Sequence, residues 1–77
     1  MGSRVAEFEW ILRDPEASAD LVREAMTQRM PLQLTPDGEI ERLLSSVEKS
    51  KAPDRRAVVE YVRAEIDARR EWARAAR

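Results

Sequence analysis

Hydrophobic residues recur at helical spacing in four separate segments of the chain. In residues 4–13, Val5, Phe8 and Leu12 follow one another at intervals of three and four, which places them on one face of a helix. Three later segments have the same kind of spacing. They are residues 15–30 with Leu21, Val22, Ala25 and Met26, residues 39–50 with Ile40, Leu43, Leu44 and Val47, and residues 54–77 with Val58, Val59, Val62 and Ile66. The pattern predicts four amphipathic helices.

Prolines and turn residues separate these segments. Proline disfavours helical backbone in the residue before it but is well tolerated at the first helical position. Asp14 is therefore predicted to cap a helix that starts at Pro15. Pro31 ends that helix. Residues 31–38 alternate apolar and polar side chains and finish in a turn signature, which predicts an extended connector.

Capping residues complete the helical pattern. Thr35 or Asp37 is expected to cap the third helix, and Asp54, which follows a second polar break, is expected to cap the fourth. The sequence thus predicts an all-α fold, a small four-helix domain built from two helical hairpins with a long C-terminal helix. Residues 1–77 are expected to form this one domain, with residues 1–3 set aside because Met-Gly-Ser is typical of an expression remnant.

The last segment changes character after Ile66. Its remaining apolar residues are Trp72 and several alanines, and they stand among the basic residues of the C-terminal end, 69–77. Such a composition keeps a helix soluble without anchoring it in a core. The end of this helix is therefore expected to project from the domain or to lie on another surface.

Composition agrees with a small helical domain. The chain has 77 residues, of which 43% are hydrophobic and 38% charged, and helices carry so much charge better than sheets do. A chain of this length buries only about 60% of the surface that its unfolded form exposes. Its core is therefore expected to be marginal, and help from a partner is expected.

Charge is divided unevenly along the chain. Residues 1–50 hold six basic and ten acidic side chains, whereas residues 51–77 hold eight basic and five acidic ones. Such a division is found where a basic segment meets an acidic partner, a nucleic acid or the acidic half of the same protein. The plainer interpretation is a solvated helix face, in which arginines complement the helix dipole.

Candidate chemistry is sparse. The chain has no histidine and no cysteine, which removes the commonest general base, the thiolate nucleophile and most ligand sets for metals. Glu7 and Glu9 point to different faces of a helix, and Gly38 stands alone rather than in a phosphate-binding loop. We therefore expect no enzyme, no catalytic residue, no cofactor, no metal and no small-molecule substrate.

The same composition bears on location. No apolar run approaches 18 residues, and there are no cysteines to form the disulfides of a small secreted domain. We expect a cytoplasmic protein that does not enter a membrane.

Several residues are candidates for contact with a partner. Tryptophan is enriched in interfaces, methionine lines adaptable grooves, and arginine pairs with carboxylates. The candidates are Trp10, Met26, Met30, Arg69, Arg70 and Trp72. They favour a protein–protein interaction or regulatory module, acting as an adaptor, a small subunit or an inhibitor. Its partner would be another protein or a second copy of the chain in a homodimer.

An alternative comes from residues 30–68, where a short apolar and polar alternation precedes two helices. This order resembles a ribbon-helix-helix domain. The resemblance implies a dimeric DNA-binding repressor or antitoxin, in which Gln33 and Thr35 would face the DNA bases. Arg55 and Arg56, at the start of the last helix, would lie near phosphate.

Overall fold

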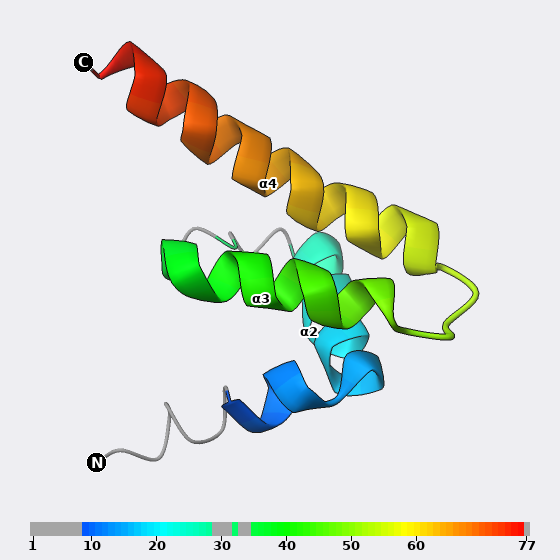
Figure 1. Cartoon of the computed structure of the whole chain (residues 1–77). Coiled ribbons are helices and arrows are strands. Elements are labelled where there is room, and N and C mark those ends of the chain that lie inside the picture. Colours follow the sequence, from blue (N-terminus) through cyan, green and yellow to red (C-terminus); the bar gives the residue numbers. More distant parts are fainter. Residues whose placement is uncertain (1–8, 29–31, 33–34, 77) are drawn as a thin grey trace.

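The structure is a computed structural model that describes residues 9–28, 32 and 35–76. Its helices are α2 (Pro15–Gln28), α3 (Asp37–Glu48) and α4 (Arg55–Ala75), and residues 9–13 form a further helical segment before α2. No β-strand occurs within the described ranges. The predicted all-α fold of four helices packed on one another is confirmed (Figure 1).

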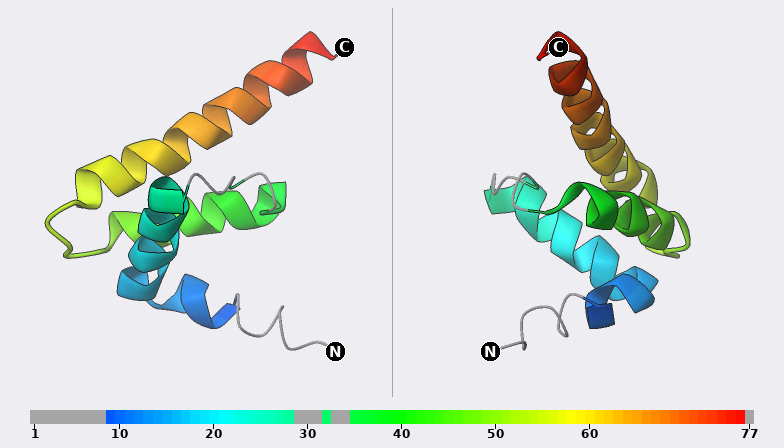
Figure 2. Two further views of the ribbon diagram at one scale, coloured as in Figure 1. Left: turned by 180° about the vertical axis from the view of Figure 1, so that it is seen from behind. Right: turned by 60° about the vertical axis from the view of Figure 1, so that its left-hand side comes forward.

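The helices cross one another rather than forming a parallel bundle (Figures 1 and 2). The α3 and α4 helices run antiparallel and make a hairpin that opens toward its far end, whereas α2 crosses behind both (Figures 1 and 2). The segment 9–13 joins α2 through a sharp turn at Asp14. Because α2 contacts both other helices, it fills the angle between them.

The core draws on all four predicted stripes. Its most deeply buried members are Val22 of α2, Leu43 and Val47 of α3, and Val58 and Val62 of α4. The remaining buried hydrophobic residues are Leu12, Ala19, Ala25, Leu32, Ile40 and Ile66. Helical spacing thus selected the buried face of α2, α3 and α4 correctly, whereas Val5 and Phe8 of the first predicted stripe lie outside the described residues.

Asp14 caps α2 as predicted. Its carboxylate accepts the backbone N–H of Glu16 at 3.0 Å and that of Ala17 at 3.3 Å, which satisfies two donors that have no partner inside the helix. Pro15, which has no N–H, occupies the first helical position.

A pair of buried serines joins α2 to its neighbours. The Ser18 hydroxyl donates to the carbonyl of Ile11 at 2.7 Å and lies 2.7 Å from the Ser46 hydroxyl of α3. Because Ser18 has only one proton to give, Ser46 must be the donor in the second bond. Both hydroxyls are therefore satisfied in the interior, and their small size lets α2 and α3 approach closely.

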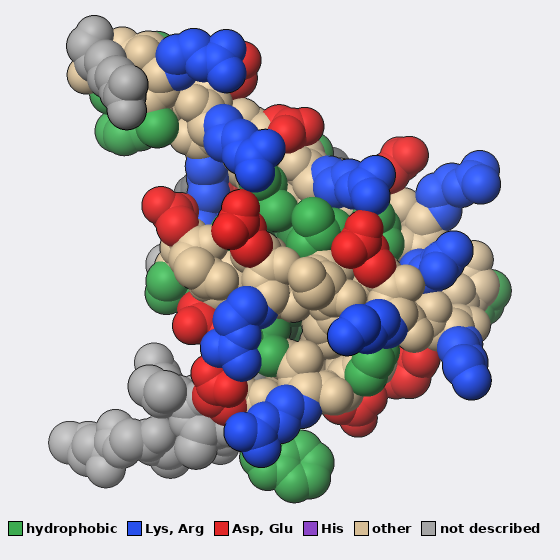
Figure 3. Space-filling view, viewed as in Figure 1, with side chains coloured by type: hydrophobic (Ala, Val, Ile, Leu, Met, Phe, Trp, Pro, Cys, Tyr) green, Lys and Arg blue, Asp and Glu red, His purple; other side chains and the backbone are tan. Residues whose placement is uncertain are grey.

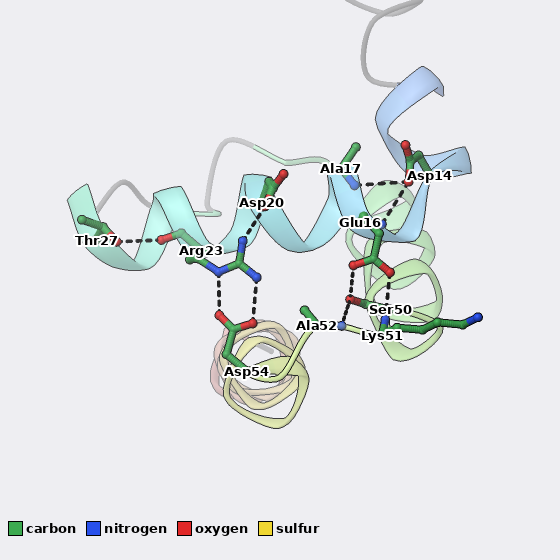
Figure 4. Close-up of polar contacts among 10 residues, drawn as sticks. All are labelled: Asp14, Glu16, Ala17, Asp20, Arg23, Thr27, Ser50, Lys51, Ala52 and Asp54. Carbon is green, nitrogen blue, oxygen red and sulfur yellow. Dashed lines mark hydrogen bonds and ion pairs between the residues drawn. The ribbon is translucent and has the colours of Figure 1, made fainter.

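Polar contacts from α2 fix the loop before α4 (Figure 4). The Glu16 carboxylate accepts the Ser50 hydroxyl and the Lys51 backbone N–H, both at 2.8 Å. Further along α2, the Arg23 guanidinium donates to both carboxylate oxygens of Asp54, at 2.6 and 2.7 Å. These contacts set the position and direction in which α4 begins.

One capping prediction is wrong, and a second is right in position only. Pro36 is the N-cap of α3, and it makes no side-chain hydrogen bond, so neither Thr35 nor Asp37 caps that helix. Asp54 is the N-cap residue of α4 as predicted, but its side chain makes no capping hydrogen bond, because both of its carboxylate oxygens are bound to Arg23. For Asp54, a partner 31 residues away in the sequence replaces the local capping bond.

The connector also differs from the extended form predicted for residues 31–38. Asp37 and Gly38 already belong to the first turn of α3. The Thr35 N–H donates to the Leu32 carbonyl at 2.8 Å, which closes a turn and leaves Leu32 buried in the core. Pro36 does have extended backbone, and residues 31, 33 and 34 lie outside the described ranges.

Core packing predicts a clear contrast between two neighbouring leucines. Leu43 is fully buried, whereas Leu44 is only partly buried at the edge of the core. We expect Leu43→Ala to lower the free energy of unfolding by about 3 kcal/mol, and Leu44→Ala by about 1 kcal/mol. Urea unfolding followed by circular dichroism measures both. Equal losses would contradict the packing described here.

The carboxylates of Glu16 and Asp54, which hold the loop before α4, predict that the fold loses stability in acid. Hydrogen bonds from Arg23 lower the pKa of Asp54, and the Lys51 backbone N–H followed by the Ser50 hydroxyl lowers the pKa of Glu16. A carboxyl whose pKa is lower in the folded state stabilises the fold above its ordinary pKa. That stabilisation is lost as the pH falls through the lowered value.

We therefore expect the Tm to be level near neutral pH and to fall below about pH 4.5. The Asp54→Asn variant should have a lower Tm at neutral pH and a smaller further loss in acid. Glu24→Gln is the control, because Glu24 accepts a hydrogen bond only from Gln28 of its own helix among the described residues. An acid loss that is the same in wild type and Asp54→Asn would contradict this account.

Candidate interaction surface

The second half of α4 extends beyond the core. The buried residues of α4 are Val58, Val62 and Ile66, and no residue from 67 to 76 is buried. The helix nevertheless continues to Ala75 and diverges from the start of α3 (Figures 1 and 2). The predicted projection of this end is confirmed for the described residues.

Arg69 is the last residue of α4 that is tied firmly to the rest of the fold. Its guanidinium donates to Glu65 and Asp37, each at 2.9 Å, and to the Leu32 carbonyl at 2.6 Å. Hydrogen bonding first to Glu65 and then to Asp37 raises the pKa of Arg69. This side chain was a candidate for partner contact, but its donors are engaged within the chain, and only 19% of it is exposed.

Two further ion pairs run along the outer edge of the α3 and α4 hairpin. Arg70 lies 3.4 Å from Glu41, and Arg63 lies 2.9 Å from Glu48. In each helix the two partners are one heptad apart, as expected for antiparallel helices lying side by side. Figure 3 shows basic and acidic side chains lying close together over this face of the molecule. The basic second half thus meets the protein's own acidic half, one of the alternatives that the charge division left open.

Trp72 lies beyond these ties and is 76% exposed. It borders a hollow between α4 and the start of α3, whose other apolar lining comes from Pro36, Ala68 and Ala73. A second hollow, lined by Ile40 and Ile66 among others, lies beside it. Arg69 and Asp37 line both hollows, so their ion pair separates the two.

The other predicted contact residues do not join Trp72 in one surface. Trp10 is also 76% exposed, but it lies in the segment 9–13, at the opposite end of the molecule from the end of α4 (Figure 1). Met26 packs partly buried against the core, and Met30 lies outside the described residues. Arg70 keeps 66% of its side chain exposed, but it faces Glu41 of α3 rather than the hollow beside Trp72.

The described residues of the ribbon-helix-helix alternative are not arranged as a DNA-binding ribbon requires. Gln33 lies outside the described residues, and Thr35 takes part in a turn rather than a strand. Arg55 donates to the Glu48 carbonyl at 3.1 Å, where it satisfies the end of α3, while Arg56 is exposed. Among the described residues, Leu32 and Thr35 are joined by a turn hydrogen bond, whereas a ribbon strand would be extended between them.

Long-range arginine contacts were missed by the sequence reasoning. Arg23 with Asp54, Arg42 with Glu9 and Arg69 with Asp37 each join residues more than thirty positions apart. Each of these arginines also has an acidic neighbour at helical spacing, namely Asp20, Glu39 or Glu65, but that local spacing does not reveal the distant partner.

Within the described ranges, no three residues of the types His, Cys, Asp and Glu are grouped so as to hold a metal ion. None of the helices described here combines the length and the apolar character needed to cross a bilayer. Comparison with protein-family models, curated proteins and solved structures gives no match to this chain.

The Arg69 contacts predict a difference between two arginines of the same helix. Arg69→Ala removes three hydrogen bonds and should lower the free energy of unfolding by about 1.5 kcal/mol. Arg74→Ala is the matched control, because the Arg74 side chain is 77% exposed and its ion pair with Glu71 is long, at 3.7 Å. It should change the stability by less than about 0.5 kcal/mol. Thermal unfolding measures the stability of both variants. Equal losses of stability would show that Arg69 does not tie α4 to the rest of the fold.

Proposed function

We propose that this chain is a non-enzymatic protein–protein interaction or regulatory module that docks through the second half of α4. Its role would be that of an adaptor, a small subunit or an inhibitor. The observation that carries the proposal is Trp72, which is 76% exposed on a helix that extends beyond its own core. A cytoplasmic location remains a prediction from composition.

Trp72 suits the role of an anchor. Tryptophan has a large apolar area and few rotatable bonds, so its burial in an interface yields much free energy for little lost entropy. Within the chain its indole contributes little to the core, because most of its surface faces solvent. A hollow lies directly beside it, and a partner side chain entering this hollow would contact Pro36, Ala68 and Trp72 together.

The construction of α4 supports the same role. Past Ile66 there is no buried side chain to hold the helix, yet it continues for more than two further turns. Arg69 and its partners fix the base of this extension, and Glu71 with Arg74 adds a pair within it. A rigid, preformed helix loses less entropy on binding than a segment that must first fold.

The test uses a photoreactive amino acid in place of Trp72, in the full chain produced in its native host. Position 24, an exposed site on α2, is the control. We expect position 72 to give an adduct of one defined mass that excess unlabelled chain suppresses, and position 24 to give none. Adducts with a second copy or with a different protein both support the proposal. Equal labelling at the two positions, or none at either, would refute it.

A quantitative prediction accompanies this test. Trp72→Ala should weaken the association found by crosslinking by about 30-fold, the effect of losing an aromatic anchor. The same variant should leave the free energy of unfolding within about 0.5 kcal/mol of wild type, because the indole is exposed. If stability and association fell together, Trp72 would belong to the core rather than to an interface.

A further inference from the structure

We propose that the partner seated on α4 is a second copy of this chain, with the two α4 helices packed antiparallel about a two-fold axis near Ile66. This inference rests on the proposed function and specifies its partner. It concerns a strip on α4, here called the outer seam, that runs beside the stripe facing the core. The outer seam consists of Ala57, Tyr61, Ala64, Ala68, Trp72 and Ala75.

The outer seam has the geometry of a helix-packing surface. Its members follow one another at intervals of four and three residues, so they form a continuous strip beside the core stripe of Val58, Val62 and Ile66. Tyr61 is partly buried against the core, and every other member is exposed. The α4 helix therefore carries two apolar strips, of which the domain itself uses one.

The order of small and aromatic residues along the outer seam is nearly symmetric about Ile66. Ala57 and Ala75 lie equally far from Ile66, and Ala64 and Ala68 also lie equally far from it. Tyr61 and Trp72 differ by a single position in their distance from the same centre. A two-fold axis places the same patch of both copies in contact, so a surface that is symmetric in this way suits pairing with itself.

In the antiparallel pair, each contact occurs twice. Tyr61 lies opposite the partner's Trp72, and Ala57 lies opposite the partner's Ala75. Facing alanines let the two backbones approach closely, and the two aromatic pairs cover indole surface that a single chain leaves exposed. The large side chains are thus matched with each other, and the small ones likewise.

Charges beside the outer seam fit the same register. Glu60 and Arg74 lie on one flank of it, two heptads apart, and antiparallel packing sets Glu60 against the partner's Arg74. Both are available, because Arg74 has only a 3.7 Å contact with Glu71 and Glu60 forms no ion pair within the described residues. Asp67, midway between them, meets its own copy near the axis, which is the one unfavourable charge contact.

The size of the contact sets its strength. The outer seam is about 27 Å long at the rise of an α-helix, and a single helix pair of this length buries less area than a standard stable interface. The dimer is therefore reversible and depends on concentration.

The first test is sedimentation equilibrium of the full chain over about 5 to 500 μM, a range suited to a small interface. Wild type should show a monomer–dimer equilibrium, and Trp72→Ala should shift it toward monomer by at least about tenfold. Trp10→Ala is the matched control and should leave it unchanged. Monomer throughout the range, or an equal effect of both substitutions, would overturn the proposal.

A charge reversal tests the register. Glu60→Arg should weaken the dimer, and adding Arg74→Glu to the same chain should restore it, because each pair is then reversed rather than lost. Asp67→Asn should strengthen the dimer by removing the repulsion at the axis. All three positions are exposed, and circular dichroism checks that each variant folds. If the variant with both Glu60→Arg and Arg74→Glu dimerised no more tightly than Glu60→Arg alone, the proposed register would be wrong.

Cysteine crosslinking tests the direction, since the chain has no cysteine of its own. Oxidation of Ala75→Cys alone should give no disulfide dimer, whereas an equimolar mixture with Ala57→Cys should give the mixed dimer. A parallel pair would give the opposite result and overturn the proposal. If the chain stays monomeric while position 72 crosslinks to a different protein, this inference fails and the proposed function stands. If neither association occurs, both fail.

Discussion

The small size of the hydrophobic core is the constraint on which the rest of this structure depends. Eleven hydrophobic residues are buried among those described, and they have to hold four helices together. Several of them are alanine or valine, which bury little area each. The fold therefore adds polar ties where the helices end or meet. Glu16 and Arg23 of α2 hold the loop before α4, and Arg42 of α3 holds Glu9 of the first segment.

The same shortage explains the character of α4. Its core stripe ends at Ile66, after which Arg69 replaces an apolar contact with one hydrogen bond to the start of α3, one to the connector and one to Glu65 of its own helix. Beyond Arg69 the helix persists through its own composition and a local ion pair. Trp72 therefore does not pack in the interior, and the end of α4 carries a large aromatic side chain that is exposed.

The sequence predicts local features well because their causes are local. The stripe of Ile40, Leu43 and Val47 specifies a buried helix face, and Asp14 beside Pro15 specifies a cap two and three residues away. The exposure of Trp72 was likewise readable from the loss of apolar periodicity after Ile66. Ties between distant residues were not. Asp54 was expected to cap α4, but its carboxylate binds Arg23, 31 residues earlier, and no spacing rule links those two positions.

The most direct test of the central claim is acrylamide quenching of Trp72 fluorescence in a Trp10→Phe variant, measured from dilute to concentrated protein. The account predicts a red-shifted, readily quenched indole in dilute protein and clear protection from quenching as the chains associate. An indole that is already protected in the most dilute sample would show that Trp72 belongs to the interior of the single chain. That result would contradict the account.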